Sequence, residues 1–124
     1  MDRDRIVRER RRLEALDAIE LEQTREEALR ERLEQTIADA EGWRADRLVL
    51  PQLSGEHAEA LRELNFDTAP PDDATRERFE EEIAELERDL EACGLRKAAL
   101  ERYADALATT PFPASPEEVV DDRR

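Results

Sequence analysis

Lysine is almost missing from this chain, in which Lys97 stands beside 19 arginines. Carboxylates are abundant, and 34 Asp and Glu against 20 Lys and Arg give a net charge of −14. Such a surface is typical of proteins adapted to high salt, because salt screens the repulsion between carboxylates. We therefore expect a halophilic source. A GC-rich genome, which also replaces Lys with Arg, is the alternative explanation.

Aromatic residues and cysteine are also scarce. Aromatics make up 4% of the chain and hydrophobic residues 39%, whereas charged residues make up 44%, against about 25% in an ordinary soluble domain. So little apolar material does not fill a compact globule with a ligand pocket, but it does fill the narrow seam between packed helices. The single cysteine, Cys93, excludes an internal disulfide.

Long apolar runs are missing throughout the chain. No run approaches the roughly 18 residues that a membrane span needs. The N-terminal sequence MDRDRIVRERRR lacks the apolar stretch of a signal peptide. We expect a cytoplasmic or virion-associated protein, not secreted by a signal peptide and without a membrane partner.

What is present are helix formers, chiefly Ala, Leu, Glu and Arg. Residues 3–41 contain neither Gly nor Pro, and Gly42 suits a helix C-terminus, so we predict a long helix over 3–41. Residues 43–53 then form a packed connector, and a short helix follows over 55–64.

A second long helix is predicted over 74–108. Pro70 and Pro71 exclude a helix before it, and Asp72 or Asp73 can cap its first turn. The remaining residues are Pro-rich and acidic, which predicts an extended tail over 109–124 after a helical domain over 1–108.

Apolar residues in the second long helix recur in alternating steps of four and three, the spacing of a heptad seam. The first long helix follows the same spacing less regularly, with a polar middle. The predicted seam comprises Leu16, Ile19, Leu33, Ile37, Phe79, Ile83, Leu86, Leu90, Leu100 and Leu107.

An antiparallel pairing of the two helices brings their irregular stretches together. Lys97, the polar seam position of the second helix, then falls beside Gln23 and Glu26, and we predict that Lys97 and Glu26 form a pair that fixes the register. The fold class is all-α: a long antiparallel, coiled-coil-like helical hairpin with a short intervening helix and an extended C-terminal tail. We expect a partner at the far end, near Leu13 and Tyr103, or on an outer stripe that contains Leu21, Ala28 and Leu95.

Catalytic and metal-binding patterns do not occur. His57 is the only histidine, and no His/Cys cluster or calcium-loop spacing accompanies it. Ser54 lies in LSGEH, which is not the G-x-S-x-G turn of a hydrolase. We expect no enzyme, no catalytic or metal residues, no cofactor and no small-molecule substrate.

The N-terminus departs from the acidic average of the chain. Arg5, Arg8 and Arg12 share one helical face, which suits a contact with nucleic acid or with an acidic partner surface. The alternative is a solvated helix end with local ion pairs. We favour that alternative because the acidic remainder repels a phosphate backbone.

Three functions compete. The first is a non-enzymatic structural or assembly protein that forms homo- or hetero-oligomers with other protein chains, such as a virion head or tail component from a halophile. The second is a chaperone, because the layout of helix, connector and helix resembles the prefoldin family. The connector RLVLPQLSGEHAEALREL departs from that family, since it predicts a loop and helix instead of a β-hairpin. The third is a regulatory nucleic-acid-binding protein that uses the Arg-rich N-terminal helix.

Overall fold

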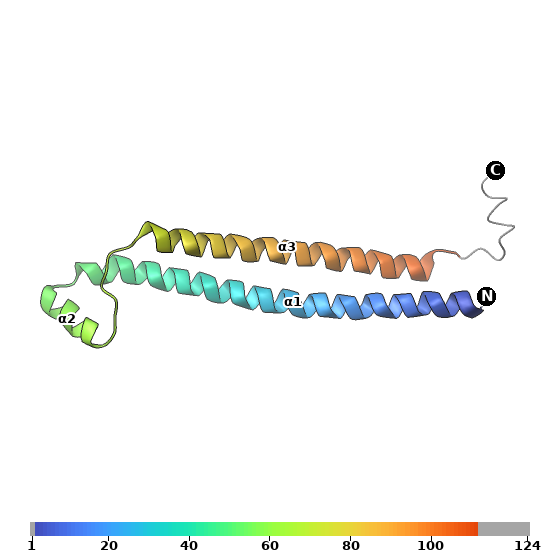
Figure 1. The fold of residues 1–124 in the computed structure, drawn as a ribbon, viewed down its shortest axis with the longest axis horizontal. Coiled ribbons are helices and arrows are strands. Elements are labelled where there is room, and N and C mark those ends of the chain that lie inside the picture. The colour runs from blue at the N-terminus through green and yellow to red at the C-terminus, as the bar shows by residue number, and fades with distance from the viewer. Residues whose placement is uncertain (1, 112–124) are drawn as a thin grey trace. The chain divides into compact units, whose positions relative to one another are not determined.

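The computed structural model describes residues 2–111, apart from the side chain of Asp2, and every regular element in this range is helical. Helix α1 (Asp2–Val49) leads through a 3₁₀ turn, η1 (Leu50–Gln52), to the short helix α2 (Gly55–Glu63) and then to α3 (Asp73–Thr109) (Figure 1). Helix α1 packs against α3, which confirms the predicted all-α helical hairpin. The predicted tail begins at the last turn of α3, and from residue 112 onward it lies outside the described residues.

The chain divides into two units. We call residues 1–26 with 92–124 the terminal unit and residues 27–91 the loop unit. Both are antiparallel. In the terminal unit Arg8 donates a hydrogen bond to the carbonyl of Thr110, near the end of α3. In the loop unit Arg32 lies 3.6 Å from Glu82.

Helix α1 is longer than the sequence predicted, because it continues through Gly42 to Val49. A glycine inside a helix costs about 1 kcal/mol relative to alanine. Contacts made beyond Gly42 offset this cost, since Trp43 packs on Phe79 and the Arg47 side chain is bonded within the loop unit. The α-helix ends before Pro51, because proline has no backbone N–H to continue the α-helical hydrogen bonds.

Helix α2 ends in a tight turn that its sequence explains. Asn65 adopts a left-handed conformation with φ of 71°, which asparagine tolerates better than most residues. The backbone N–H groups of Asn65 and Phe66 donate to the carbonyls of Arg62 and Leu61, both at 3.0 Å. This Schellman-type arrangement satisfies the last carbonyls of α2 and carries the chain toward α3.

Helix α3 begins with the cap that the sequence predicted, supplied by Asp72. Its carboxylate accepts hydrogen bonds from the Thr75 backbone N–H at 2.6 Å and from the Thr75 hydroxyl at 2.9 Å. These two bonds hold the pKa of Asp72 below its usual value, since they favour the charged form.

The core of each unit is thin. Apart from small residues, the only buried apolar side chains among the described residues are Leu50 and Leu86, at 8% and 6% exposure and both in the loop unit. Within residues 2–111 no helix has a segment long and apolar enough to cross a membrane.

Candidate interaction surfaces

The predicted seam of α3 faces α1 in both units. Leu86 is 6% exposed, and the other predicted positions are half-buried. These half-buried positions are Phe79, Ile83, Leu90, Leu100 and Leu107.

The seam of α1 differs from the prediction at two of its four predicted positions. Ile19 and Leu33 are half-buried as predicted, but Leu16 and Ile37 are 38% and 37% exposed. Their preceding neighbours Ala15 and Thr36 are buried instead, at 3% and 6% exposure. A small side chain lets two helices approach closely, whereas a leucine or isoleucine fits at the margin of the contact. The structure therefore corrects the sequence-based choice of Leu16 and Ile37.

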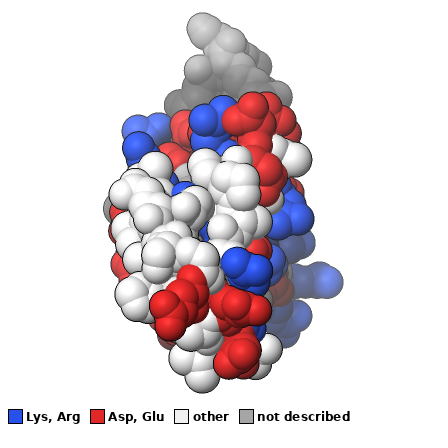
Figure 2. Space-filling model, turned by 90° about the vertical axis from the view of Figure 1, so that its left-hand side faces the viewer, with Lys and Arg blue, Asp and Glu red and all other residues white. Residues whose placement is uncertain are grey.

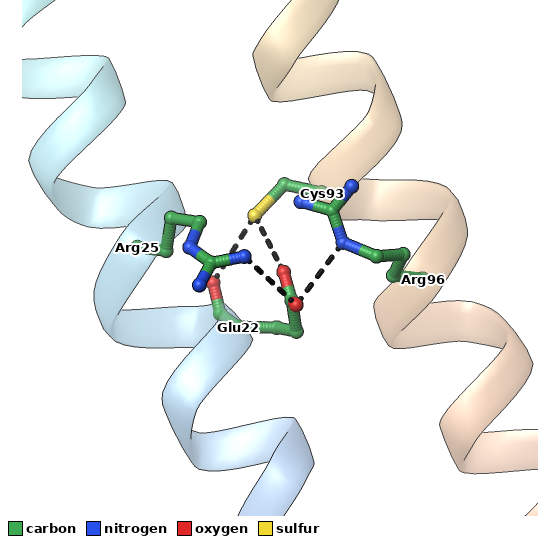
Figure 3. A network of polar contacts seen from close by, with 4 residues as sticks. All are labelled: Glu22, Arg25, Cys93 and Arg96. Atoms are coloured by element: carbon green, nitrogen blue, oxygen red, sulfur yellow. Dashed lines mark hydrogen bonds and ion pairs between the residues drawn. The ribbon is translucent and has the colours of Figure 1, made fainter.

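A polar cluster interrupts the seam in the terminal unit (Figure 3). The carboxylate of Glu22, on α1, lies between Cys93 and Arg96 of α3. Arg25, which is also on α1, contacts the same carboxylate. The Cys93 thiol donates to Glu22 Oε2 at 3.0 Å, while Arg96 Nε and an Arg25 terminal nitrogen lie 3.0 and 3.3 Å from Glu22 Oε1. The Glu22 side chain is only 13% exposed, so its charge is compensated almost entirely by these partners.

The cluster shifts the proton affinities of its members in opposite directions. The thiol hydrogen bond and Arg96 lower the pKa of Glu22 from its ordinary 4.5. The hydrogen bond to Glu22 and burial raise the pKa of Cys93 from 9.0. Because nucleophilic cysteines act as thiolates, a buried thiol with a raised pKa is a structural residue. Cys93 also continues the steps of four and three along α3, so it is a small residue of the seam.

The predicted register pair lies next to this cluster. The Lys97 ammonium is 3.2 Å from a Glu26 carboxylate oxygen, and the two side chains are 25% and 15% exposed. The structure thus brings together the two residues that the antiparallel pairing placed side by side. Glu22, at the adjoining level, was not predicted to face α3.

Arg47 anchors the loop before α3 to α1. It is 5% exposed, and its guanidinium donates to the backbone carbonyls of Ala69, at 2.7 Å, and Asp67. The Asp67 carboxylate lies 3.2 Å from the same guanidinium, and a hydrogen bond from the Ala69 N–H, together with Arg47, lowers the Asp67 pKa. Sequence reasoning missed this anchor because it ended the helix at Gly42. The signal was present, since Ala40, Trp43 and Arg47 continue the steps of three and four.

An open groove lies beside this anchor. It encloses about 610 Å³ between the last turns of α1 and the first turns of α3. Trp43 and Phe79 line it, with ring centroids 6.0 Å apart and planes inclined by 49°. Arginine and carboxylate side chains of both helices complete the lining, so the groove has no single charge preference.

The N-terminal arginines divide between the seam and the solvent. Arg8 and Arg12 are half-buried on the side of α1 that faces α3, and Arg12 lies 3.2 Å from Glu9. Arg5 is exposed. The predicted contact face of Arg5, Arg8 and Arg12 therefore points mostly toward the seam. The outward-facing arginines nearby are Arg3 and Arg10, which the prediction did not include.

Large apolar side chains are exposed in both units. In the terminal unit Leu13, Leu21, Leu95 and Tyr103, where we expected partner contacts, are 52%, 71%, 67% and 46% exposed. In the loop unit the exposed set surrounds η1 and the two ends of α2, and we call it the end patch. The end patch comprises Leu48, Val49, Leu53, Leu64 and Phe66. Figure 2 views this part of the molecule and shows a broad uncharged area with acidic and basic side chains at its margin.

Groups with catalytic chemistry are few in residues 2–111. Ser54 Oγ lies 3.2 Å from His57 Nδ1, but both residues are exposed at the start of α2, and the contact spans one helical turn. No cluster of three or more His, Cys, Asp or Glu side chains in the described range could hold a metal ion.

Comparison with known proteins gives no relative for this chain: no family model matches it, and neither the curated proteins nor the solved structures yield a significant match.

Proposed function

We propose that this chain is a non-enzymatic assembly protein that binds other protein chains through exposed apolar surfaces of its helical hairpin. One observation carries the proposal: the end patch exposes Leu48, Val49, Leu64 and Phe66 by 54%, 57%, 68% and 47%. Contiguous apolar patches of this kind are rare on monomers and mark interaction sites.

The energetics of the end patch support a protein partner. Complete burial of one large apolar side chain is worth roughly 1.5–3 kcal/mol. Five half-exposed side chains that become covered together can therefore contribute several kcal/mol to binding, by the same area scale. The fold itself keeps few such groups inside, since Leu50 and Leu86 are the only buried large apolar residues in the described range.

A coiled-coil-like helical hairpin that presents such patches suits a subunit of a larger particle. The heptad spacing of the buried positions in both long helices supports this architecture. The acidic, lysine-poor composition supports a source adapted to high salt, and we propose a virion head or tail component as one setting for the assembly.

The alternative of a nucleic-acid-binding protein is weaker. Arg8 and Arg12, which the hypothesis needs on an outer face, are half-buried beside α3. The chaperone alternative uses the same exposed apolar surfaces as the proposed function. A chaperone would differ in binding unfolded chains without a fixed stoichiometry.

Site-specific photo-crosslinking tests the proposal. Phe66 is replaced by a photo-reactive phenylalanine analogue in the producing cell, and a matched variant carries the analogue at the exposed position Glu81 on α3. We expect one or a few discrete crosslinked protein bands from position 66 and none from position 81. A heterogeneous smear from position 66 would favour the chaperone, and equal labelling from both positions would refute a specific surface.

A further inference from the structure

The charge of this protein is divided unequally between the two units. The loop unit, residues 27–91, contains 20 acidic and 8 basic side chains and has a net charge of −12. The described part of the terminal unit, residues 3–26 and 92–111, contains 9 acidic and 10 basic side chains, a net charge of +1. One chain therefore carries both a strongly acidic surface and a surface with no acidic excess.

The N-terminal turns of α1 present a cationic and apolar stripe away from α3. Arg3, Ile6 or Val7, Arg10 and Leu13 succeed one another at spacings of three or four residues, so all five residues lie on one helical face, and we call them the cationic stripe. Glu14 lies on the same face, and its carboxylate is 3.5 Å from Arg11. Ile6, Val7 and Leu13 are 58%, 53% and 52% exposed. Arg3 and Arg10 are exposed and make no ion pair within residues 2–111.

This stripe lies opposite the helix face that packs. In the same turns the half-buried or buried positions are Arg8, Arg12 and Ala15. Since 3.6 residues complete one turn, these positions lie about 180° around the helix from the cationic stripe. The stripe is consequently not used by the hairpin itself.

The end patch of the loop unit has the complementary character. Exposed acids stand near its apolar residues in the sequence: Asp46 lies two positions before Leu48, Glu63 directly precedes Leu64, and Asp67 directly follows Phe66. They outnumber the one exposed arginine among these neighbours, Arg62. The Asp67 side chain is 77% exposed although it is held by Arg47. Figure 2 shows acidic side chains, with basic ones among them, at the margin of the uncharged area in this part of the molecule.

We propose that the cationic stripe of one copy of this protein docks on the end patch of a second copy. The inference rests on the proposed assembly function and names its partner. Apolar side chains would meet in the centre of the contact, and Arg3 and Arg10 would lie against the acids at its margin. Complementary potentials of this kind fix orientation and raise the association rate.

The alternative pairings within a homo-oligomer are disfavoured by charge. Two end patches placed face to face oppose acid to acid, and two stripes oppose arginine to arginine. The contact joins two different surfaces, so two assemblies are possible. Two copies form a closed dimer with two equivalent contacts, or each copy binds the next in an extended chain of copies.

Charge reversal tests the contact by light scattering on the full-length protein. The stripe variant is R3E/R10E, and the patch variant is D46R/E63R. Arg88 and Arg102 are exposed on α3, outside both surfaces, so R88E/R102E is a control with the same charge change as the stripe variant. Circular dichroism establishes that every variant keeps its helical content.

We expect a defined oligomer for the wild type and for R88E/R102E, and monomers for the stripe and patch variants alone. Mixing the stripe and patch variants should restore association, since the reversed charges are again complementary. The difference in association between the wild type and the stripe and patch variants should shrink as salt rises from roughly 50 mM to 500 mM, because screening weakens the charged margin of the contact and leaves its apolar centre.

A wild type that stays monomeric at all salt concentrations overturns the contact between copies. The same holds if the stripe and patch variants associate as the wild type does, or if the stripe binds anionic vesicles or nucleic acid without any self-association. The proposed assembly function is tested separately. Discrete crosslinks from position 66 to a different protein would uphold it even if the pure chain were monomeric.

Discussion

Replacement of Leu86 by alanine should destabilise the protein more than any other single truncation in α3. Leu86 is 6% exposed, and it is the one large apolar side chain of α3 that is buried. Leu→Ala changes at buried sites cost about 2–5 kcal/mol, and the cost depends on how far the surroundings collapse into the space. The seam has half-buried neighbours that can move inward, so we expect the lower part of this range, about 2–3 kcal/mol.

The matched control is Leu95→Ala on the same helix. Leu95 is 67% exposed, so the same chemical change removes little buried surface. Alanine also has a helix propensity at least equal to that of leucine. We expect the free energy of unfolding to change by less than about 0.5 kcal/mol for Leu95→Ala.

Urea denaturation followed by circular dichroism at micromolar protein concentration measures both variants. With a slope of about 1–3 kcal/mol per molar urea, a loss of 2–3 kcal/mol lowers the midpoint by roughly 0.7–3 M. Equal midpoints for Leu86→Ala and Leu95→Ala would refute the assignment of Leu86 to the interior. A larger loss for Leu95→Ala would place the packed face of α3 on its other side.

Three further predictions concern the polar contacts. Arg47→Lys should lower the free energy of unfolding by about 1–3 kcal/mol, because an ammonium cannot replace the guanidinium group that donates to two carbonyls. Hydrogen exchange of the Asp67–Ala69 amides should accelerate in this variant. If exchange there is unchanged, Arg47 is not the anchor. A double-mutant cycle with Glu26→Gln and Lys97→Met should give a coupling of about 1 kcal/mol or less, since both groups retain some solvent contact; zero coupling would remove their role in fixing the register. Because the pKa of Cys93 is raised above 9.0, the stability that its thiol contributes is fully present below pH 9 and is lost as the pH rises through the folded-state value. The stability of the wild type should therefore fall above pH 9 relative to that of Cys93→Ala, and parallel pH curves for the two proteins would contradict the thiol–carboxylate contact.

Much of the second half of the fold could be read from the sequence because its signals are local or strictly periodic. Alternating steps of four and three along α3 identify its inner face without any knowledge of the partner helix. Asp72 is a cap because its short carboxylate reaches the N–H of the first turn, and such a bond depends only on neighbouring residues. The pairing of Glu26 with Lys97 followed from the same periodicity, since an antiparallel register leaves these two polar positions side by side.

The candidate surfaces were predicted less completely. Leu13, Leu21, Leu95 and Tyr103 could be named because the seam leaves them outside. The end patch could not be predicted from the sequence, because Leu48 and Val49 were assigned to a packed connector. The position of Phe66 also depends on a left-handed turn at Asn65.

By itself, the sequence determined the helices, the antiparallel hairpin and the inner face of α3, because helix propensity, prolines, caps and heptad spacing act within a few turns of one chain. Only the tertiary structure decided which face of α1 turns inward and where α1 ends. Ala15 and Thr36 displace Leu16 and Ile37 from the seam because closeness of approach between helices outweighs the hydrophobicity of single residues. Gly42 remains helical because Trp43 and Arg47 find partners that are distant in sequence, on α3 and in the loop before it, and local signals do not contain that information.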